Sequence, residues 1–346
     1  MVSSGSVAVV IPCWNGEKSI KNMLNSLLQQ SYQNWIAYIV DDQSQDNSAG
    51  VIQQYAKNDD RFHYLIRSRE PKGAQTCRNI GLEAAFGAEY ICFFDADDRL
   101  SPCCLEQRVR YMNDNPELDF GIFPAYGITV TNVICESAVW GFRLCDDSLQ
   151  EMLQRTLPMV GWTNIYRYDS IVKYRLKWDE RLKSLQDSDW NIQAIIQGLR
   201  YDYAISSGAD FDYFYIVGDK ASVSNNIDSI SHCQSHICFL SKTVEALSES
   251  QRIKYYTAIC SYHLWIGELC IKDRAILMEF LHSPWLARNK WVKFRIELLS
   301  LLRFRGVKYL FPKVSRESKL VFNEWTESKI SYLRRCIIGD SLPKIS

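Results

Sequence analysis

Four short apolar runs, separated by segments with helical spacing, occupy the first part of the chain and restrict the folds open to it. The runs cover residues 7–11, 36–40, 62–66 and 90–94. Each has the length of a buried strand. Apolar stripes typical of amphipathic helices lie between them and begin at Ile20, Val51 and Ile80. Strands that alternate with helices predict an α/β fold, with a mostly parallel sheet flanked by helices.

The rest of the sequence divides into two parts. Strand-like pieces at 120–123, 128–134 and 213–217 mix with a helical piece at 187–197. A stretch rich in Ser, Asn and Asp at 222–231 then marks a boundary, beyond which the pattern is mainly helical. We therefore expect one domain over residues 1–230, divided at about 118/119, and a helical C-terminal region over residues 231–346.

Composition narrows the class of protein. Hydrophobic residues make up 47% and charged residues 23%, as in globular proteins, and the formal net charge of +0 gives no reason to expect a nucleic-acid partner. The first residues lack the basic and apolar segments of a signal peptide, and no apolar run has the length that spans a bilayer. We expect a cytoplasmic protein whose 12 cysteines are reduced.

An acidic cluster follows the fourth apolar run. Asp95, Asp97 and Asp98 place three carboxylates within four residues, where they repel one another unless a cation lies among them. Mg²⁺ and Mn²⁺ prefer oxygen ligands and are often held by one or two carboxylates together with substrate phosphates. A solvated acidic turn before a helix that begins near Ser101 is the alternative, and the residues alone leave both open.

Polar or aromatic residues also follow the first two runs. Asp41 and Asp42 come at the end of the second run, where carboxylates can accept hydrogen bonds from a nucleoside. Pro12 and Gly16 predict a tight turn after the first run, which leaves Trp14 able to stack on a base. The alternatives are an ordinary strand-to-helix turn for the acids and a buried packing role for Trp14.

Four segments together resemble the family 2 glycosyltransferases, which have the GT-A fold. They are VVIPCWN (9–15), VDDQS (40–44), KGAQTCRNIGL (72–82) and FDADD (94–98). Their order and spacing match the family over about residues 5–105, and a weaker match extends to about residue 225. The resemblance implies that about 5–118 bind a nucleotide sugar and that about 119–230 supply the acceptor side and the catalytic base.

The resemblance assigns residues to the nucleotide. Asp42 matches the residue that contacts the base, and Asp41 matches a neighbour that lines the pocket. Pro12 and Trp14 match the segment that packs around the base. Arg78 matches a basic position that faces the nucleotide side of the cleft, with a packing role in its helix as the alternative.

The resemblance also assigns the metal and the base. Asp97 matches the direct ligand of Mn²⁺ or Mg²⁺, and Asp95 matches the other member of the Asp-x-Asp pair, nearer the ribose. Asp187 matches the catalytic Asp of an acidic pair whose Glu is replaced here by Gln186. Asp189 is a rival for that role, although on a helix its side chain would point away from that of Asp187.

The activity implied is transfer of a hexosyl group, with inversion, from a nucleotide sugar to an acceptor hydroxyl. UDP-sugars are the commonest donors in the family. The acceptor would be a saccharide or a lipid-linked saccharide in bacterial polysaccharide or glycolipid synthesis. Two alternatives stay open: a nucleotidyltransferase, which would want a glycine-rich basic loop after the first strand, and an inactive scaffold with this fold.

The C-terminal region contains a basic segment. Residues 288–319 hold ten basic residues and two acids, interleaved with aromatic and aliphatic residues. This pattern is typical of a helix that lies on an anionic membrane surface, and it would place the protein peripherally on the inner face of the cell membrane. The alternative is a helical appendage whose apolar face packs on the catalytic domain or a partner.

Overall fold

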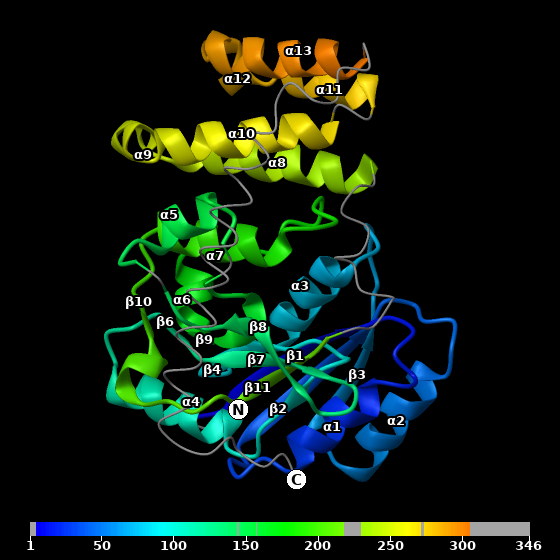
Figure 1. The fold of residues 1–346 in the computed structure, drawn as a ribbon. Helices are drawn as coiled ribbons and strands as arrows, with labels where there is room; N and C mark the ends of the chain where they lie inside the picture. The colour runs from blue at the N-terminus through cyan, green and yellow to red at the C-terminus, as the bar shows by residue number, and fades with distance from the viewer. Residues whose placement is uncertain (1–4, 144, 157, 218–229, 271–272, 305–346) are drawn as a thin grey trace.

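A seven-stranded sheet forms the centre of the structure, a computed structural model that describes residues 5–143, 145–156, 158–217, 230–270 and 273–304. The strand order is β10-β6-β9-β4-β1-β2-β3 (Figure 1). The strands are β1 (Val7–Cys13), β2 (Trp35–Asp41), β3 (Phe62–Ile66), β4 (Tyr90–Phe93), β6 (Phe120–Ile122), β9 (Asn164–Arg167) and β10 (Tyr201–Tyr203). Only β9 runs antiparallel to its neighbours β4 and β6. The α/β fold with a mostly parallel sheet is thus confirmed.

Helices cover both faces of this sheet. Alternate residues of its strands point to opposite faces, and the apolar side chains on each face pack against helices. Val7, Val9 and Ile11 of β1 pack in one core with α1, α2 and α4, whereas Ala8 and Val10 pack in another with α3, α6 and α7. The helices are α1 (Ile20–Leu28), α2 (Ser48–Asn58), α3 (Ala74–Ala84), α4 (Cys104–Asp114), α6 (Tyr168–Lys173) and α7 (Gln186–Ile196).

A second sheet of four strands lies beside the first, in the order β5-β11-β7-β8. Its strands are β5 (Arg99–Leu100), β7 (Ala125–Thr129), β8 (Ile134–Trp140) and β11 (Tyr213–Val217). The single strand expected over 128–134 is wrong, because these residues contain the turn between β7 and β8. Asn132 adopts a φ of +62° there and its amide donates to the carbonyl of Thr129 at 2.9 Å. β-Branched residues on both sides of Asn132 hid this turn.

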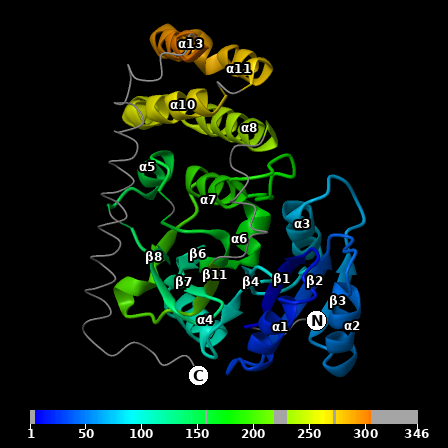
Figure 2. The same ribbon diagram turned by 45° about the vertical axis from the view of Figure 1, so that its right-hand side comes forward.

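The C-terminal helices stack above α5 (Ser148–Leu153) and α7 in two layers (Figures 1 and 2). They are α8 (Ile230–Ala246), α9 (Glu249–Lys254), α10 (Tyr256–Cys270), α11 (Arg274–Leu281), α12 (Pro284–Arg288) and α13 (Lys290–Phe304). Leu182 and Ile192 join the apolar core of these helices, which ties them to the sheet domain. Residues 222–229, most of the expected boundary stretch, lie outside the described residues. Among the described helices, none has the length and apolar content needed to cross a membrane.

Candidate active site

The carboxyl ends of β1, β2 and β4 bring the predicted site residues to one edge of the large sheet. The amide of Asp42 donates to the carbonyl of Cys13 at 2.7 Å, so the segments after β1 and β2 begin side by side. Pro12 is buried within β1 opposite Val40 of β2. Trp14 and Asp95 follow the neighbouring strands β1 and β4, which are parallel.

The two acids after β2 differ in their partners. Asp41 accepts hydrogen bonds from the amide and hydroxyl of Ser44, so its carboxylate stabilises the turn that follows. Asp42 is buried and forms an ion pair with the equally buried Arg67, which directly follows β3. A second guanidinium nitrogen of Arg67 contacts Glu70 at 3.0 Å. Arg67 therefore orients the carboxylate of Asp42 and offsets its charge.

Trp14 is held at the surface of this edge. Its side chain is 56% exposed, which excludes the buried packing role, and the ammonium of Lys72 lies 4.2 Å from its ring centroid. The next residue, Asn15, is fixed to the loop after β2 by a bond of 2.9 Å from its amide to the hydroxyl of Ser44. The Trp14 indole therefore lies beside the loop after β2, and its ring is already in contact with the Lys72 ammonium.

The acidic cluster after β4 separates into three roles. Asp98 is fully buried and accepts bonds from the hydroxyl of Tyr213 at 2.6 Å and the amide of Ile216 at 2.9 Å. Burial, together with the charges of Asp97 and Asp95, raises the pKa of Asp98 well above its ordinary value. Asp95 is half-buried and Asp97 is exposed. Asp98 thereby fixes the loop, whereas Asp95 and Asp97 lie nearer its surface.

These two carboxylates fit a divalent cation that a substrate helps to hold. Among the described residues, no three His, Cys, Asp or Glu side chains form a group that could bind a metal ion alone. Asp97 is exposed, whereas Asp95 shares one oxygen with Arg78. Mg²⁺ and Mn²⁺ sites with one or two carboxylates are commonly completed by phosphate oxygens and water. The donor set therefore suits Mn²⁺ or Mg²⁺ bound together with a diphosphate.

Arg78 joins the acidic loop to the segment that carries Asp187. One terminal nitrogen of its buried guanidinium donates to Oδ1 of Asp95 at 2.6 Å, and the other donates to Oε1 of Gln186 at 3.1 Å. The guanidinium also lies 4.6 Å from the ring centroid of Trp178. Arg78 thus has the packing role proposed as an alternative and lies in the candidate site at the same time.

Asp187 lies in the first turn of α7. The amide of Gly161 donates to its Oδ1 at 2.9 Å, which fixes the carboxylate. Burial raises the pKa of Asp187, while the charge of Arg78 lowers it and that of Asp95 raises it further. A carboxylate with a raised pKa suits proton abstraction better than an ordinary surface Asp does.

Asp189 faces another part of the molecule. Its carboxylate is 1% exposed and forms an ion pair of 2.7 Å with Lys242 of α8. Lys242 also pairs with Asp179 at 3.1 Å. This network joins α7 to the C-terminal helices, so Asp189 has a structural role and Asp187 remains the candidate base.

Sequence analysis missed several residues of this site. Arg67 and Tyr213 hold Asp42 and Asp98, and Gly161 holds Asp187. Each of these residues is at least 25 positions from its partner in the sequence, and the shortest separation is that of Arg67 and Asp42. The only sequence signal was the position of Arg67 directly after a predicted strand.

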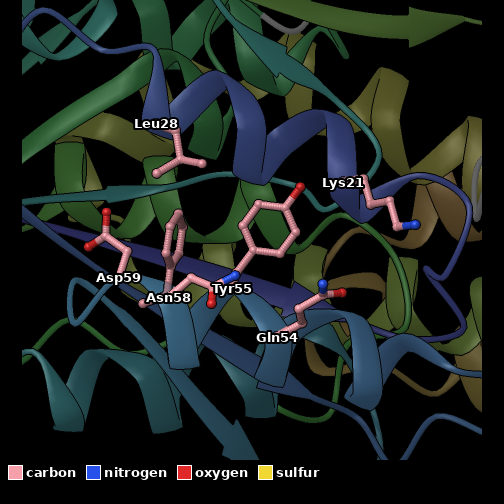
Figure 3. Close-up of a pocket in the computed structure, with 7 residues that line it drawn as sticks. Lys21, Leu28, Gln54, Tyr55, Asn58 and Asp59 are labelled. Atoms are coloured by element: carbon pink, nitrogen blue, oxygen red, sulfur yellow. The ribbon is translucent and has the colours of Figure 1, made fainter.

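A groove of about 490 Å³ lies elsewhere, between α1 and α2 (Figure 3). It is lined by Lys21, Leu28, Gln54, Tyr55, Asn58, Asp59 and Phe62. None of these is a residue predicted for the site, and we assign the groove no part in it.

Solved structures share this fold. The S. aureus TarS 1-349 structure in complex with UDP-GlcNAc aligns with a TM-score of 0.59 at 16% identity, covering 88% of this chain and 93% of that one. The mannosyltransferase PcManGT from Pyrobaculum calidifontis, in complex with GDP-Man and Mn²⁺, aligns with a TM-score of 0.53 at 15% identity, covering 94% and 86%. The fold is therefore that of the GT-A glycosyltransferases.

The sequence places the chain within that class. Residues 8–174 match the family described as Glycosyl transferase family 2, so this part of the chain is a family 2 glycosyltransferase domain. The putative teichuronic acid biosynthesis glycosyltransferase TuaG of Bacillus subtilis is 38% identical over 106 residues, 31% of this chain and 41% of TuaG. The putative glycosyltransferase EpsH of Bacillus subtilis is 29% identical over 195 residues, 55% of each chain.

A further relative is named for its substrates. The UDP-Glc:alpha-D-GlcNAc-diphosphoundecaprenol beta-1,3-glucosyltransferase WfgD of Escherichia coli is 33% identical over 109 residues, 32% of this chain and 42% of WfgD. The chain thus spans only about two-fifths to just over half of the length of these three relatives.

Proposed function

We propose that this protein transfers a hexosyl group from a UDP-sugar to an acceptor hydroxyl, with inversion, in the synthesis of a polysaccharide or glycolipid. The observation that carries the proposal is the position of Arg78, which bonds to Asp95 on one side and to Gln186 on the other. Arg78 and Gln186 are 108 positions apart in the sequence. Their bond joins the predicted donor site to the segment that carries the predicted base, Asp187.

Three features support UDP as the nucleotide. Asp42 is held by Arg67 at the carboxyl end of β2, and Trp14 presents an exposed ring nearby. The neighbouring TarS structure contains UDP-GlcNAc, and the relative WfgD is named for UDP-Glc. The neighbour PcManGT contains GDP-Man, so GDP-Man is the donor to test against UDP-sugars.

Mn²⁺ or Mg²⁺, held by Asp97 and Asp95, would stabilise the charge that develops on the departing diphosphate. Arg78 keeps the carboxylate of Asp95 in place through its bond of 2.6 Å. Asp187, fixed by the amide of Gly161, takes the proton from the acceptor hydroxyl as that oxygen attacks the anomeric carbon. Attack from the face opposite the leaving group inverts the anomeric configuration in one displacement.

The test is incubation of the chain with UDP-Glc, UDP-GlcNAc and GDP-Man, with and without Mn²⁺, and identification of the released nucleotide. Metal-stimulated release of UDP supports the proposal, with D187N as the matched control. Conversion of the nucleotide sugar and added pyrophosphate to a nucleoside triphosphate and a sugar 1-phosphate would indicate a nucleotidyltransferase instead. Absence of any turnover, with an intact fold by circular dichroism, would favour the inactive scaffold.

We also propose that α13 places the enzyme on an anionic membrane, where a lipid-linked acceptor would lie. Val292 and Ile296 point into the core of the C-terminal helices, whereas Trp291 and Phe294 are 64% and 58% exposed. The apolar face expected to pack on neighbouring helices therefore exists, and the two large aromatic residues are not part of it. Aromatic side chains are favoured at membrane interfaces because their rings suit the headgroup level.

Basic residues surround the exposed rings. Lys290 and Lys293 share this helix, and the guanidinium of Arg295 lies 4.7 Å from the ring centroid of Trp291. This charge is complementary to anionic lipid headgroups, each Lys or Arg near the surface contributing about 1 kcal/mol. Residues 305–319 of the predicted basic segment lie outside the described residues, so the proposal rests on residues 288–304.

Co-sedimentation with vesicles of phosphatidylcholine, with or without phosphatidylglycerol, tests this second proposal. We expect salt-sensitive recovery with the anionic vesicles only, lost in the W291S/F294S variant. The matched control is I253S, since Ile253 of α9 is 73% exposed but lies on another helix. Equal recovery with both vesicles, recovery with neither, or an unaffected W291S/F294S variant would contradict the proposal.

A further inference from the structure

Helix α3 makes an extended set of contacts with the segment that leads to Asp187. The helix itself is pressed against the sheet: a Cβ added at Gly81 would lie 2.3 Å from Cγ1 of Val10, so only glycine allows this approach. Gln75 and Asn79, one helical turn apart, are both nearly fully buried on this helix. Both side chains are shielded from solvent, and the amide nitrogen of each finds its partners within the protein.

The partner of Asn79 is the backbone of Trp178. Its Nδ2 donates to the carbonyl of Trp178 at 2.9 Å, and its Oδ1 accepts from the amide of the same residue at 3.0 Å. The same Nδ2 also donates to the Glu180 carboxylate at 2.8 Å. One amide side chain thus satisfies both backbone groups of a residue 99 positions away, as a neighbouring β-strand would.

Gln75 continues the pattern toward α7. Its Nε2 donates to the carbonyl of Leu182 at 2.8 Å and to that of Glu180 at 3.2 Å. Residues 178–182 are therefore held against α3 by two side chains, and Leu185, with a φ of +62°, then turns the chain into α7. Asp187 follows in the first turn of that helix.

Trp178 connects this segment to the site itself. Its indole stacks on Trp190 of α7, with ring centroids 4.6 Å apart, and carries the guanidinium of Arg78 at 4.6 Å. A displacement of Trp178 would therefore move both the group that holds Asp95 and the helix that carries Asp187. Fixing the backbone of Trp178 fixes the distance between the two halves of the site.

We propose that Asn79 is a positioning residue, which sets the base Asp187 at its working distance from the donor held at Asp95. This inference rests on the glycosyl transfer proposed above. Asn79 itself touches no reacting group, and it acts through Trp178. Its removal should therefore impair turnover and leave intact the donor contacts made from β1 and β2, since a misplacement of about 1 Å costs about 100-fold in rate.

The experiment compares N79A with the wild-type chain and with N115A, which removes a side-chain amide that donates to the nearby carbonyl of Tyr111 at 2.8 Å. We expect kcat of N79A to fall by about 10- to 100-fold, with the Kd for the UDP-sugar changed less than about threefold. N115A should keep both values. The second variant, Q75A, loses the bonds to Glu180 and Leu182 and should give a smaller loss of kcat.

The outcomes separate this inference from the proposed function. A wild-type chain that releases UDP, together with an N79A variant of unchanged kcat, would overturn the positioning role alone. A loss of donor affinity equal to the loss of kcat in N79A would overturn it as well, because that result indicates general damage. If N79A does not fold, Q75A decides between the same outcomes. A wild-type chain without turnover is the failure of the proposed function instead.

Discussion

Arg78 and Asp95 form a bond of 2.6 Å between two parts of the chain that sequence analysis treated as separate motifs. The side chain of Arg78 is 6% exposed and that of Asp95 is 29% exposed, so the pair extends from the interior to the edge of the candidate site. Because the second arm of the guanidinium bonds to Gln186, the acidic loop cannot move without affecting the start of α7. The residues predicted to bind the metal and the donor are therefore linked to the segment that carries the predicted base.

The two arms of Arg78 predict different results for R78K and R78M. A lysine keeps the positive charge but cannot form both bonds, so we expect kcat to fall about tenfold with little change in pH dependence. R78M also removes the charge that lowers the pKa of Asp187. Since Asp187 accepts a proton only when ionised, the acidic limb of the kcat profile should move to higher pH in R78M. A pH profile of UDP release checks this, and identical limbs for R78K and R78M would contradict it.

The pair D187N and D189N tests the assignment of the base. D187N should lower kcat by about 100-fold or more and leave donor affinity nearly unchanged, because only the proton acceptor is lost. D189N should instead lower the melting temperature, since it weakens the ion pair with Lys242 that joins α7 to α8. Steady-state kinetics and thermal unfolding of both variants distinguish them. A large loss of kcat in D189N with a small one in D187N would reverse the assignment.

Asp97 should determine the response to metal. In D97A we expect the Mn²⁺-dependent part of UDP-sugar binding to disappear, because Asp95 alone shares its carboxylate with Arg78. Calorimetric titration of the UDP-sugar with and without Mn²⁺ measures this directly. D46A is the control, since Asp46 lies in the loop after β2 and bonds to the amide of Glu17. Metal-stimulated binding by D97A at the level of the parent would remove Asp97 from the metal site.

The sequence was sufficient to predict β1 to β4 and β6 of the large sheet, but not β9 or β10. Strands β1 and β4 are fully buried and β2 is largely buried, so they form continuous apolar runs, and the polar residues that follow them mark the strand ends. Helical geometry likewise placed Asp187 and Asp189 on different sides of α7, as their bonds to Gly161 and Lys242 show.

The contacts that complete the site could not be predicted in this way. Arg67 holds Asp42, and Asn79 holds Trp178, through side-chain bonds between distant residues that leave no periodic pattern. The hairpin of β7 and β8 was missed for a related reason: residues on both sides of its turn are β-branched, and only Asn132 indicates the reversal. The periodicity of apolar residues indicates which side chains are buried. It does not indicate which helices and strands pack together, and these side-chain bonds depend on that packing.

Gly161 gives the last prediction, because its amide holds the candidate base and its lack of a side chain leaves room for that base. A Cβ at this position would lie 2.6 Å from Oδ1 of Asp187 and 2.9 Å from Cη2 of Trp178. In G161A the carboxylate or the indole must therefore shift, and we expect kcat to fall about 10- to 100-fold with donor affinity nearly unchanged. The control is G50A on α2, whose new Cβ would meet the flexible side chain of Asn47, the residue before that helix. Kinetics and a crystal structure of G161A provide the check. An unchanged kcat in a variant whose Asp187 has moved would show that the position of this carboxylate does not limit the reaction.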